Sequence, residues 1–347
     1  MSAYISTQSI ASLLRQSVLR LQSDLASTEK ELATGKHADI GLALAGRAGD
    51  SLSLQGETSR LQAIITANQT VSTRLAATAN ILGRLQESAQ ELLDGILQGD
   101  GSPLNASTIQ KLGETNLKEL ISSLNTSVQG EHIFGGTNTA APPITDYYAP
   151  AAANKAAIDS AFLSAFGFMQ NSELVADISG EGMKTFLDTQ FSSLFDDLSW
   201  TTLWSSASSE MLTSRISKHE IIPASVSANL PVFQRLAEAY TMVASLGTDA
   251  LNADAYRTLT LKAANLLKSA ISSLIDVQAN TGLVQSRINK AATDMSLQIN
   301  ILSMHIGDLE NVNPYEAATR VASLQTQIQI SYSLTSQLQH LSLVEFL

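Results

Sequence analysis

The chain has 347 residues, of which 44% are apolar and 15% are charged, and its net charge is −11. Its length and apolar share suffice for a sizeable core in two or three compact parts, while the charged share is low for a soluble protein. The acidic balance with scattered Lys and Arg excludes a nucleic-acid partner, and the absence of cysteine excludes disulfides, thiolate metal sites and thiol catalysis.

The N-terminus and the hydropathy profile indicate where the protein resides. Residues 1–8 have neither a basic region nor an apolar core with a cleavage site, so we expect no ordinary secretory signal. No apolar run approaches the ~20 residues of a membrane-spanning helix, the nearest being 40–45. We therefore expect a soluble protein without membrane insertion, and any export must use another route.

Apolar residues at steps of three and four predict two helices in the first hundred residues. The first carries Ile10, Leu14, Val18, Leu21, Leu25 and Leu32, with Thr28 completing the spacing. Gly35 ends this helix, and a loop rich in Gly and Ala is expected over 36–49. A heptad stripe over 54–96 then predicts one unbroken helix, typical of a coiled coil or helical rod. Within it, Asn68, Ser72 and Gln86 would fix the register.

The middle of the chain has a different character. A turn at 99–103 precedes a shorter helix that carries Leu117 to Val128 and ends at Gly130, followed by a brief strand and turn at 131–136. Most aromatic residues gather in the next hundred positions, which indicates a separate compact core. Alternation in 200–204 and β-branched residues in 213–222 predict strands, so this region is expected to be an α+β insert.

Helix returns at Pro231 and continues to the end of the chain. A seam from Tyr256 leads into a stripe over 288–309, and Asn313 and Pro314 then begin a last helix, with Glu316 completing a capping box. That helix carries the apolar residues Val321, Leu324, Ile328, Leu334, Leu338 and Leu341.

Both ends of the chain carry seams without a local partner. We therefore expect the terminal helices to pair with each other or with copies in neighbouring subunits. The predicted fold is mainly α, a long antiparallel helical rod or coiled coil built from both chain ends, with a small α+β domain inserted in the middle.

The residue types argue against an enzyme, and we predict no catalytic residue, no metal site and no cofactor. The five histidines, His37, His132, His219, His305 and His340, show no metal-ligand spacing. His219 and Glu220 would point to opposite faces of a strand. The pair Gly35-Lys36 lacks the upstream glycine of a phosphate loop, and 196–197 more simply ends a helix or faces water.

Several short motifs resemble a known family. The segment 33–36 (Ala-Thr-Gly-Lys) and the chain end 341–347 are similar to the flagellin superfamily of bacterial axial proteins. Within it, 132–137 (His-Ile-Phe-Gly-Gly-Thr) with Pro142-Pro143, and 314–319 (Pro-Tyr-Glu-Ala-Ala-Thr), resemble the hook-filament junction members, the hook-associated proteins 3. The segments 204–208 and 225–229 are similar to alphaproteobacterial members. One departure is His37-Ala38-Asp39, where the family commonly has paired aspartates.

The resemblance implies a structural axial protein of the bacterial flagellum, an adaptor at the hook-filament junction that filament assembly and motility need. It would be exported unfolded by the flagellar type III apparatus without a cleaved signal peptide, and would act outside the cell. Implied partners are further copies in a ring, the neighbouring hook-associated protein, flagellin and an export chaperone. The alternatives are a filament flagellin, or a coiled-coil signalling or tethering protein with a ligand-binding insert.

The same resemblance divides the chain into three parts. Residues 1–45 and 303–347 would form terminal helices in an inner tube core, 46–133 and 230–302 a helical rod, and 134–229 the outer insert. The assembly seam would consist of Ile10, Leu14, Val18, Leu21, Leu25, Leu32, Val321, Leu324, Ile328, Leu334, Leu338 and Leu341.

Overall fold

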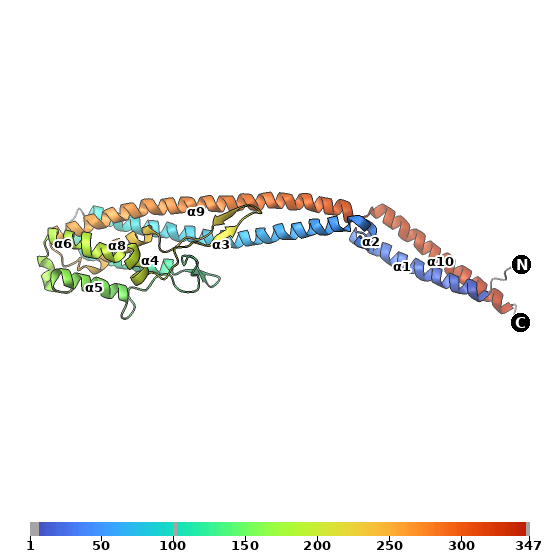
Figure 1. The fold of residues 1–347 in the computed structure, drawn as a ribbon, viewed down its shortest axis with the longest axis horizontal. Coiled ribbons are helices and arrows are strands. Elements are labelled where there is room, and N and C mark those ends of the chain that lie inside the picture. Colours follow the sequence, from blue (N-terminus) through green and yellow to red (C-terminus); the bar gives the residue numbers. More distant parts are fainter. Residues whose placement is uncertain (1–6, 100–102, 345–347) are drawn as a thin grey trace. The chain divides into compact units, whose positions relative to one another are not determined.

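The computed structural model describes residues 7–99 and 103–344, and long helices dominate these ranges (Figure 1). The longer helices are α1 (Thr7–Thr34), α3 (Ala48–Gln98), α4 (Ala106–Leu124), α5 (Ala153–Phe166), α8 (Pro231–Ser245), α9 (Ala253–Glu310) and α10 (Pro314–Val344). The shorter helices are α2 (Ile40–Leu44), η1 (Ala45–Arg47), η2 (Pro103–Asn105), η3 (Glu173–Asp177), α6 (Gly180–Phe186), η4 (Leu187–Phe191), η5 (Ser192–Phe195), α7 (Asp197–Ser199) and η6 (Trp200–Trp204). Strand β1 (Ser127–Val128) pairs antiparallel with β2 (Glu131–His132), and β3 (Thr213–Arg215) with β4 (Ile221–Pro223). The prediction of a mainly α fold with a small strand-containing region is confirmed.

The chain forms two compact units. Unit 1 comprises Met1–Gln62 and Met295–Leu347, and unit 2 comprises Ala63–Asp294. Helices α3 and α9 contribute residues to both units. The finer division into terminal helices, rod and insert stays a prediction.

The break before the last helix lies where the sequence predicts it. Helix α9 ends at Glu310 and α10 begins at Pro314, whose missing N–H would have no helical partner at this position. The Asn313 side chain accepts a hydrogen bond from the Tyr315 amide at 3.0 Å and so caps α10.

The prediction of an irregular loop over 36–49 is wrong. The segment contains α2 and η1 before α3 begins at Ala48. Asp39 is extended, with φ of −128°, and its Oδ1 accepts a hydrogen bond from the Leu42 amide at 2.9 Å. This cap satisfies a free amide of the first turn and allows a short helix despite the glycines. The Gly and Ala content predicts a loop because composition takes no account of the Asp39 cap.

The prediction of a strand over 200–204 is also wrong, because this segment is the helical turn η6. The Trp200 and Trp204 side chains are buried and their rings stack at 5.6 Å, while Tyr147 also stacks on Trp204 at 5.6 Å. A spacing of four residues brings side chains together on one helix face. The packing of large rings therefore outweighed the weak alternation of the intervening residues.

The β-branched run over 213–222 forms a hairpin, with Ser214 opposite Ile222. The hairpin lies against α3, because Asn68, which is 1% exposed, donates a hydrogen bond to the Ile216 carbonyl at 2.9 Å. Asn68 in the α3 stripe thus holds the hairpin.

The predicted helix to Gly130 instead ends at Leu124, and Val128 belongs to β1.

A single hydrophobic core runs through unit 2. It joins Leu82 to Ile96 of α3 with α4, α8 and the unit-2 part of α9, and it includes the buried aromatic side chains of the middle region. These are Phe134, Tyr147, Phe162, Phe186, Phe191, Phe195, Trp200 and Trp204. The aromatic residues therefore extend the core of the helices.

The motif 132–137 is a tight turn that requires its glycines. Phe134 is fully buried against Phe233, with ring centroids 5.7 Å apart. A Cβ on Gly135 would overlap the Asn138 carbonyl oxygen, and Gly136 has a φ of +62°. Only glycine fits these two positions, so the local backbone explains the motif.

Candidate assembly surface

Helices α1 and α10 lie side by side in unit 1 (Figure 1). The buried residues between them are Val18, Thr28, Ala317 and Leu324, each between 3% and 8% exposed. Gln22 Nε2 on α1 donates a hydrogen bond to the Tyr332 hydroxyl on α10 at 2.8 Å. The pair is therefore held by few fully buried side chains.

The structure places the twelve predicted seam residues in three groups. Val18 and Leu324 are buried, and Ile10, Leu14, Leu21, Leu25, Val321 and Ile328 are half-buried. Leu32 and Leu334 are 40% and 46% exposed. The side chains of Leu338 and Leu341 lie outside the described part of the chain. Membership of an assembly seam stays a prediction for all twelve.

The inward stripe of α10 differs from the predicted one. After Ala317, Val321, Leu324 and Ile328 it continues with the half-buried Ser331 and Thr335. Leu334 is one position away from Thr335, and a step of one residue turns it by about 100° around the helix. Because residues 331 and 335 are polar, the spacing of apolar residues does not identify this face of α10.

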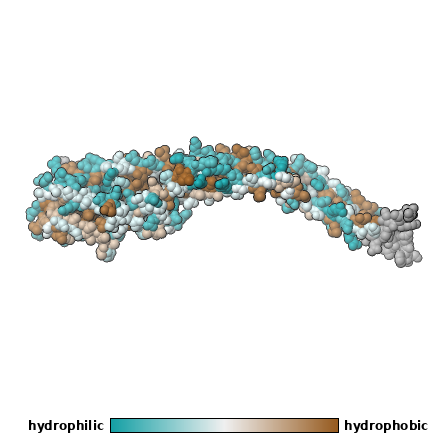
Figure 2. Space-filling model, in the orientation of Figure 1, coloured by the Kyte–Doolittle hydropathy of each residue, from teal (hydrophilic) through white to brown (hydrophobic). Residues whose placement is uncertain are grey.

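Exposed apolar side chains are concentrated in unit 1. Of the 22 large hydrophobic residues that are exposed in the described part of the chain, twelve belong to unit 1, which contains one third of the residues. They are Leu13, Leu19, Leu32, Leu42, Leu52, Leu297, Ile301, Met304, Tyr315, Ile330, Tyr332 and Leu334. Figure 2 shows apolar residues lying among polar ones on the visible surface. Contacts with other protein chains would remove this apolar area from water.

A buried carboxylate joins three chain segments in unit 1. Glu310, the last residue of α9, is 0% exposed. Its Oε2 accepts from Lys36 Nζ at 2.8 Å, and its Oε1 accepts from the Ser51 hydroxyl and from Gln55 Nε2. Lys36 follows α1, whereas Ser51 and Gln55 belong to the first turns of α3. We call these four residues the Glu310 junction.

The backbone completes the Glu310 junction. The His37 amide donates to the Glu310 carbonyl, and the Val312 amide donates to the Gly35 carbonyl, both at 2.9 Å. Lys36 and Asn311 form an antiparallel bridge between these bonds. Gly35 has a φ of +71°, so the turn out of α1 uses the left-handed region that glycine tolerates best.

Charge pairing decides the protonation of the Glu310 junction. Lys36 first, and then Ser51 and Gln55, hold the pKa of the Glu310 carboxyl below its ordinary value, against the opposing effect of burial. Folding therefore favours the ionised form, and the contribution of Glu310 to stability is lost as the pH falls through its lowered pKa. Sequence reasoning missed this site, although an acidic residue at a helix C-terminus, where the helix dipole disfavours it, is a detectable signal.

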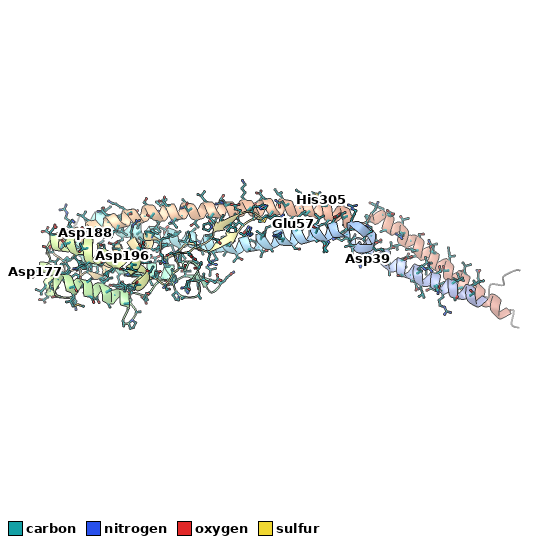
Figure 3. The ribbon with its side chains drawn as sticks, in the orientation of Figure 1. Asp39, Glu57, Asp177, Asp188, Asp196 and His305 are labelled. Carbon is teal, nitrogen blue, oxygen red and sulfur yellow. The ribbon has the colours of Figure 1, made fainter. Side chains whose placement is uncertain are left out.

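The other polar candidates have separate structural roles. Asp196 caps α7, accepting from the Ser199 amide at 2.8 Å, and Asp197 accepts from Gln234 at 3.0 Å. Asp188 accepts from Lys184 and Lys262, which together lower its pKa to about 2. Figure 3 labels Asp188 and Asp196 in unit 2, where Asp188 belongs to η4 and Asp196 directly precedes α7. Each carboxylate is thus explained by a local contact.

The histidines are also dispersed. His132 Nδ1 lies 2.8 Å from the Asn125 carbonyl oxygen, and His37 lies 3.7 Å from Glu31. His219 is in the turn between β3 and β4, and His305 is exposed on α9 (Figure 3). His340 is outside the residues whose side chains are described. Within the described ranges, no group of three or more His, Asp or Glu residues has the arrangement of a metal site.

These features describe a helical protein whose paired terminal helices expose apolar side chains. Such an arrangement is typical of a structural protein that associates with other chains. Residues 5–139 match the bacterial flagellin N-terminal helical region, and residues 264–347 match the bacterial flagellin C-terminal helical region. The chain belongs to the flagellin family, and its role is that of a structural component of the bacterial flagellum, to which it is exported.

Two solved structures are similar to this chain. A putative flagellar hook-associated protein from Vibrio parahaemolyticus has 11% identity and a TM-score of 0.52, over 76% of this chain and 97% of the other. FlgL from Bacillus cereus has 15% identity and a TM-score of 0.46, over 74% of this chain and 99% of the other. No curated protein matches the sequence.

None of the described helices combines the length and the hydropathy that a membrane span requires.

Proposed function

We propose that this protein is an adaptor at the junction between the flagellar hook and the filament, and that filament assembly and motility require it. It has no catalytic role, and self-association in a ring occurs through unit 1. The single observation that carries this proposal is the concentration of exposed apolar side chains in unit 1, beside the sparsely buried pair α1–α10. Such a surface loses contact with water only when neighbouring subunits cover it.

Two sequence motifs favour the adaptor over a filament subunit. The segments 132–137 and 314–319 resemble junction proteins, and both have defined structural roles here. The first forms the tight glycine turn beside Phe134, and the second begins α10 with the Asn313 cap. The alphaproteobacterial type of junction protein is the proposed subgroup.

The partners follow from the same proposal. Unit 1 contacts further copies in the ring, the neighbouring hook-associated protein and the first flagellin subunits. The last helix binds an export chaperone before assembly, because its exposed Ile330, Tyr332 and Leu334 need cover in the cytoplasm. Export proceeds through the flagellar type III apparatus, and the protein acts outside the cell.

Electron microscopy of a deletion strain tests the adaptor. We expect hooks without filaments and flagellin shed into the medium, and complementation with the intact gene should restore filaments. Intact filaments in the deletion strain would exclude an adaptor.

Filament flagellin is the second candidate, because the family match covers both terminal regions. Immunogold labelling separates the two. An adaptor gives one focus at the distal end of each hook, whereas a flagellin labels the entire filament. Label in the cell body, together with a stable dimer of the purified protein, would instead favour a coiled-coil tethering protein.

A further inference from the structure

The hydrophobic core of unit 2 does not reach along all of α3 and α9. Its buried residues begin at Ile81 in α3 and end at Leu274 in α9, although both helices continue within the unit. We call the remaining parts of the two helices, residues 63–80 and 275–294, the rod stretch. Its buried residues are Ile65, Asn68, Leu75, Thr78, Thr281, Ile288 and Ala291. Three of these are polar, so apolar burial alone holds the rod stretch weakly.

The hairpin β3–β4 has buried side chains that do not belong to the hydrophobic core of unit 2. Ile216, which directly follows β3, is 0% exposed, and Ile222 of β4 is 1% exposed. Neither is a member of that core. A two-stranded hairpin has too little surface to bury large side chains by itself. The two isoleucines must therefore be covered by a neighbouring part of the molecule.

The contacts of the hairpin identify this neighbour as the rod stretch. Asn68 Nδ2 on α3 donates a hydrogen bond to the Ile216 carbonyl oxygen at 2.9 Å. From the other helix, Arg287 Nε on α9 donates to Glu220 Oε1, in the turn of the hairpin, at 3.0 Å. The hairpin thus contacts both helices (Figure 1). The bond from Asn68 is the more important one, because it is buried whereas Arg287 and Glu220 are exposed.

We propose that the hairpin β3–β4 is a clasp that holds α3 and α9 together along the rod stretch, and that Asn68 is the residue that positions it. Ile216 and Ile222 add the apolar contact that the polar buried residues of the two helices do not supply. The clasp lies entirely within unit 2. Its role concerns the fold of a single chain and does not depend on the proposed place in the flagellum.

Hydrogen–deuterium exchange with mass spectrometry on the full-length protein tests the clasp. Asn68→Ala leaves the Ile216 carbonyl buried without its donor, and Ile222→Ala removes a buried side chain from the hairpin. In both variants we expect the amides of residues 68–80 and 281–292 to exchange about tenfold faster than in the parent. The amides of the core segments, residues 82–96 and 256–274, should keep the parental rates.

Two further variants make the comparison specific. Gln69→Ala is the matched control for Asn68→Ala, because Gln69 is the exposed neighbour on α3 and its loss should leave every rate unchanged. Ile222→Val removes only one methyl group and is read where Ile222→Ala unfolds the whole unit; it should accelerate the same segments several-fold. The emission of Trp200 and Trp204 reports in each sample whether the core of unit 2 is folded.

Two results would overturn the proposal. Faster exchange confined to the hairpin, residues 213–223, in the Asn68 and Ile222 variants would show that the hairpin rests on the helices without holding them. Equal acceleration of the rod stretch and the core segments in Asn68→Ala and Ile222→Val would show that the hairpin supports unit 2 as a whole and has no particular role in the rod stretch.

Discussion

At the scale of single residues, two buried glutamates show how the surroundings decide the state of a carboxyl group. Glu310 has a lysine and two hydrogen-bond donors, which lower its pKa. Glu238 on α8 is 8% exposed, and its burial raises its pKa to about 7, with Lys262 and Arg235 opposing the shift. Glu310 is therefore held charged, whereas Glu238 stays protonated in mild acid and loses its proton around pH 7.

Glu238 makes a pH dependence measurable. Because its pKa is raised on folding from 4.5 to about 7, the folded state binds the proton more tightly, and stability falls as the pH rises between these values. Glu238→Gln removes this dependence. We expect the variant to have a melting temperature several degrees above the parent at pH 8, corresponding to an effect on the order of 3 kcal/mol or less, and nearly the same one at pH 5.

The matched control for Glu238 is Glu87→Gln, since Glu87 is exposed on α3 of the same unit. Its melting temperature should follow the parent at both pH values. A constant difference between Glu238→Gln and the parent across this range would contradict the assigned protonation.

At the scale of elements, close packing between helices depends on small residues. Helices α4 and α8 pack along their length, and a Cβ on Gly113 would lie 2.9 Å from Val243 Cγ1 and 3.3 Å from the Ala244 nitrogen. Gly113 is therefore required by the neighbouring helix and not by its own backbone.

Gly113→Ala should destabilise unit 2 by about 1–3 kcal/mol, because the added methyl overpacks the interface. Thermal unfolding followed by circular dichroism and tryptophan emission measures this change. Gly83→Ala is the matched control in α3, where a Cβ meets nothing within 4 Å, and it should raise stability by about 0.5–1 kcal/mol. Equal effects of the two variants would contradict the packing assigned to Gly113.

The paired helices of unit 1 lead to a second prediction at this scale. Leu324→Glu places a charge between α1 and α10, where Leu324 is 7% exposed. We expect unit 2 to keep its tryptophan emission while incorporation into flagella and swimming are lost; Ile328→Glu should act similarly. Gln325→Glu, at the exposed neighbouring position, should swim normally. Normal motility of Leu324→Glu would contradict an assembly role for this face.

At the scale of the whole molecule, the two units differ in how much they bury. Unit 2 contains a continuous core with many fully buried side chains, whereas the pair α1–α10 has few. Local stability follows buried apolar contact, so unit 1 should open more readily than unit 2.

The purified full-length protein should be a monomer whose ends are digested first. We expect proteolysis up to about residue 45 and from about residue 300, leaving a resistant central fragment. Size-exclusion chromatography with light scattering gives the mass, and mass spectrometry identifies the fragments. A stable soluble dimer with protected ends would contradict the adaptor and favour the tethering alternative.

Much of this architecture is determined by the sequence alone, because heptad spacing is a local property. The stripe over 54–96 predicts α3, and Asn313-Pro314 predicts the start of α10, since a cap and a fixed φ act within a few residues. The motifs at 132–137 and 314–319 likewise indicate the family before any contact is known.

Only the tertiary structure decided which faces are covered and which polar groups meet. Residues Ser331 and Thr335 face inward while Leu334 does not, because the alignment of α10 places them there. Trp200 and Trp204 form a helical turn because their rings stack in a shared core. Glu310 meets Lys36 across 274 positions of sequence, a distance over which no local pattern carries information.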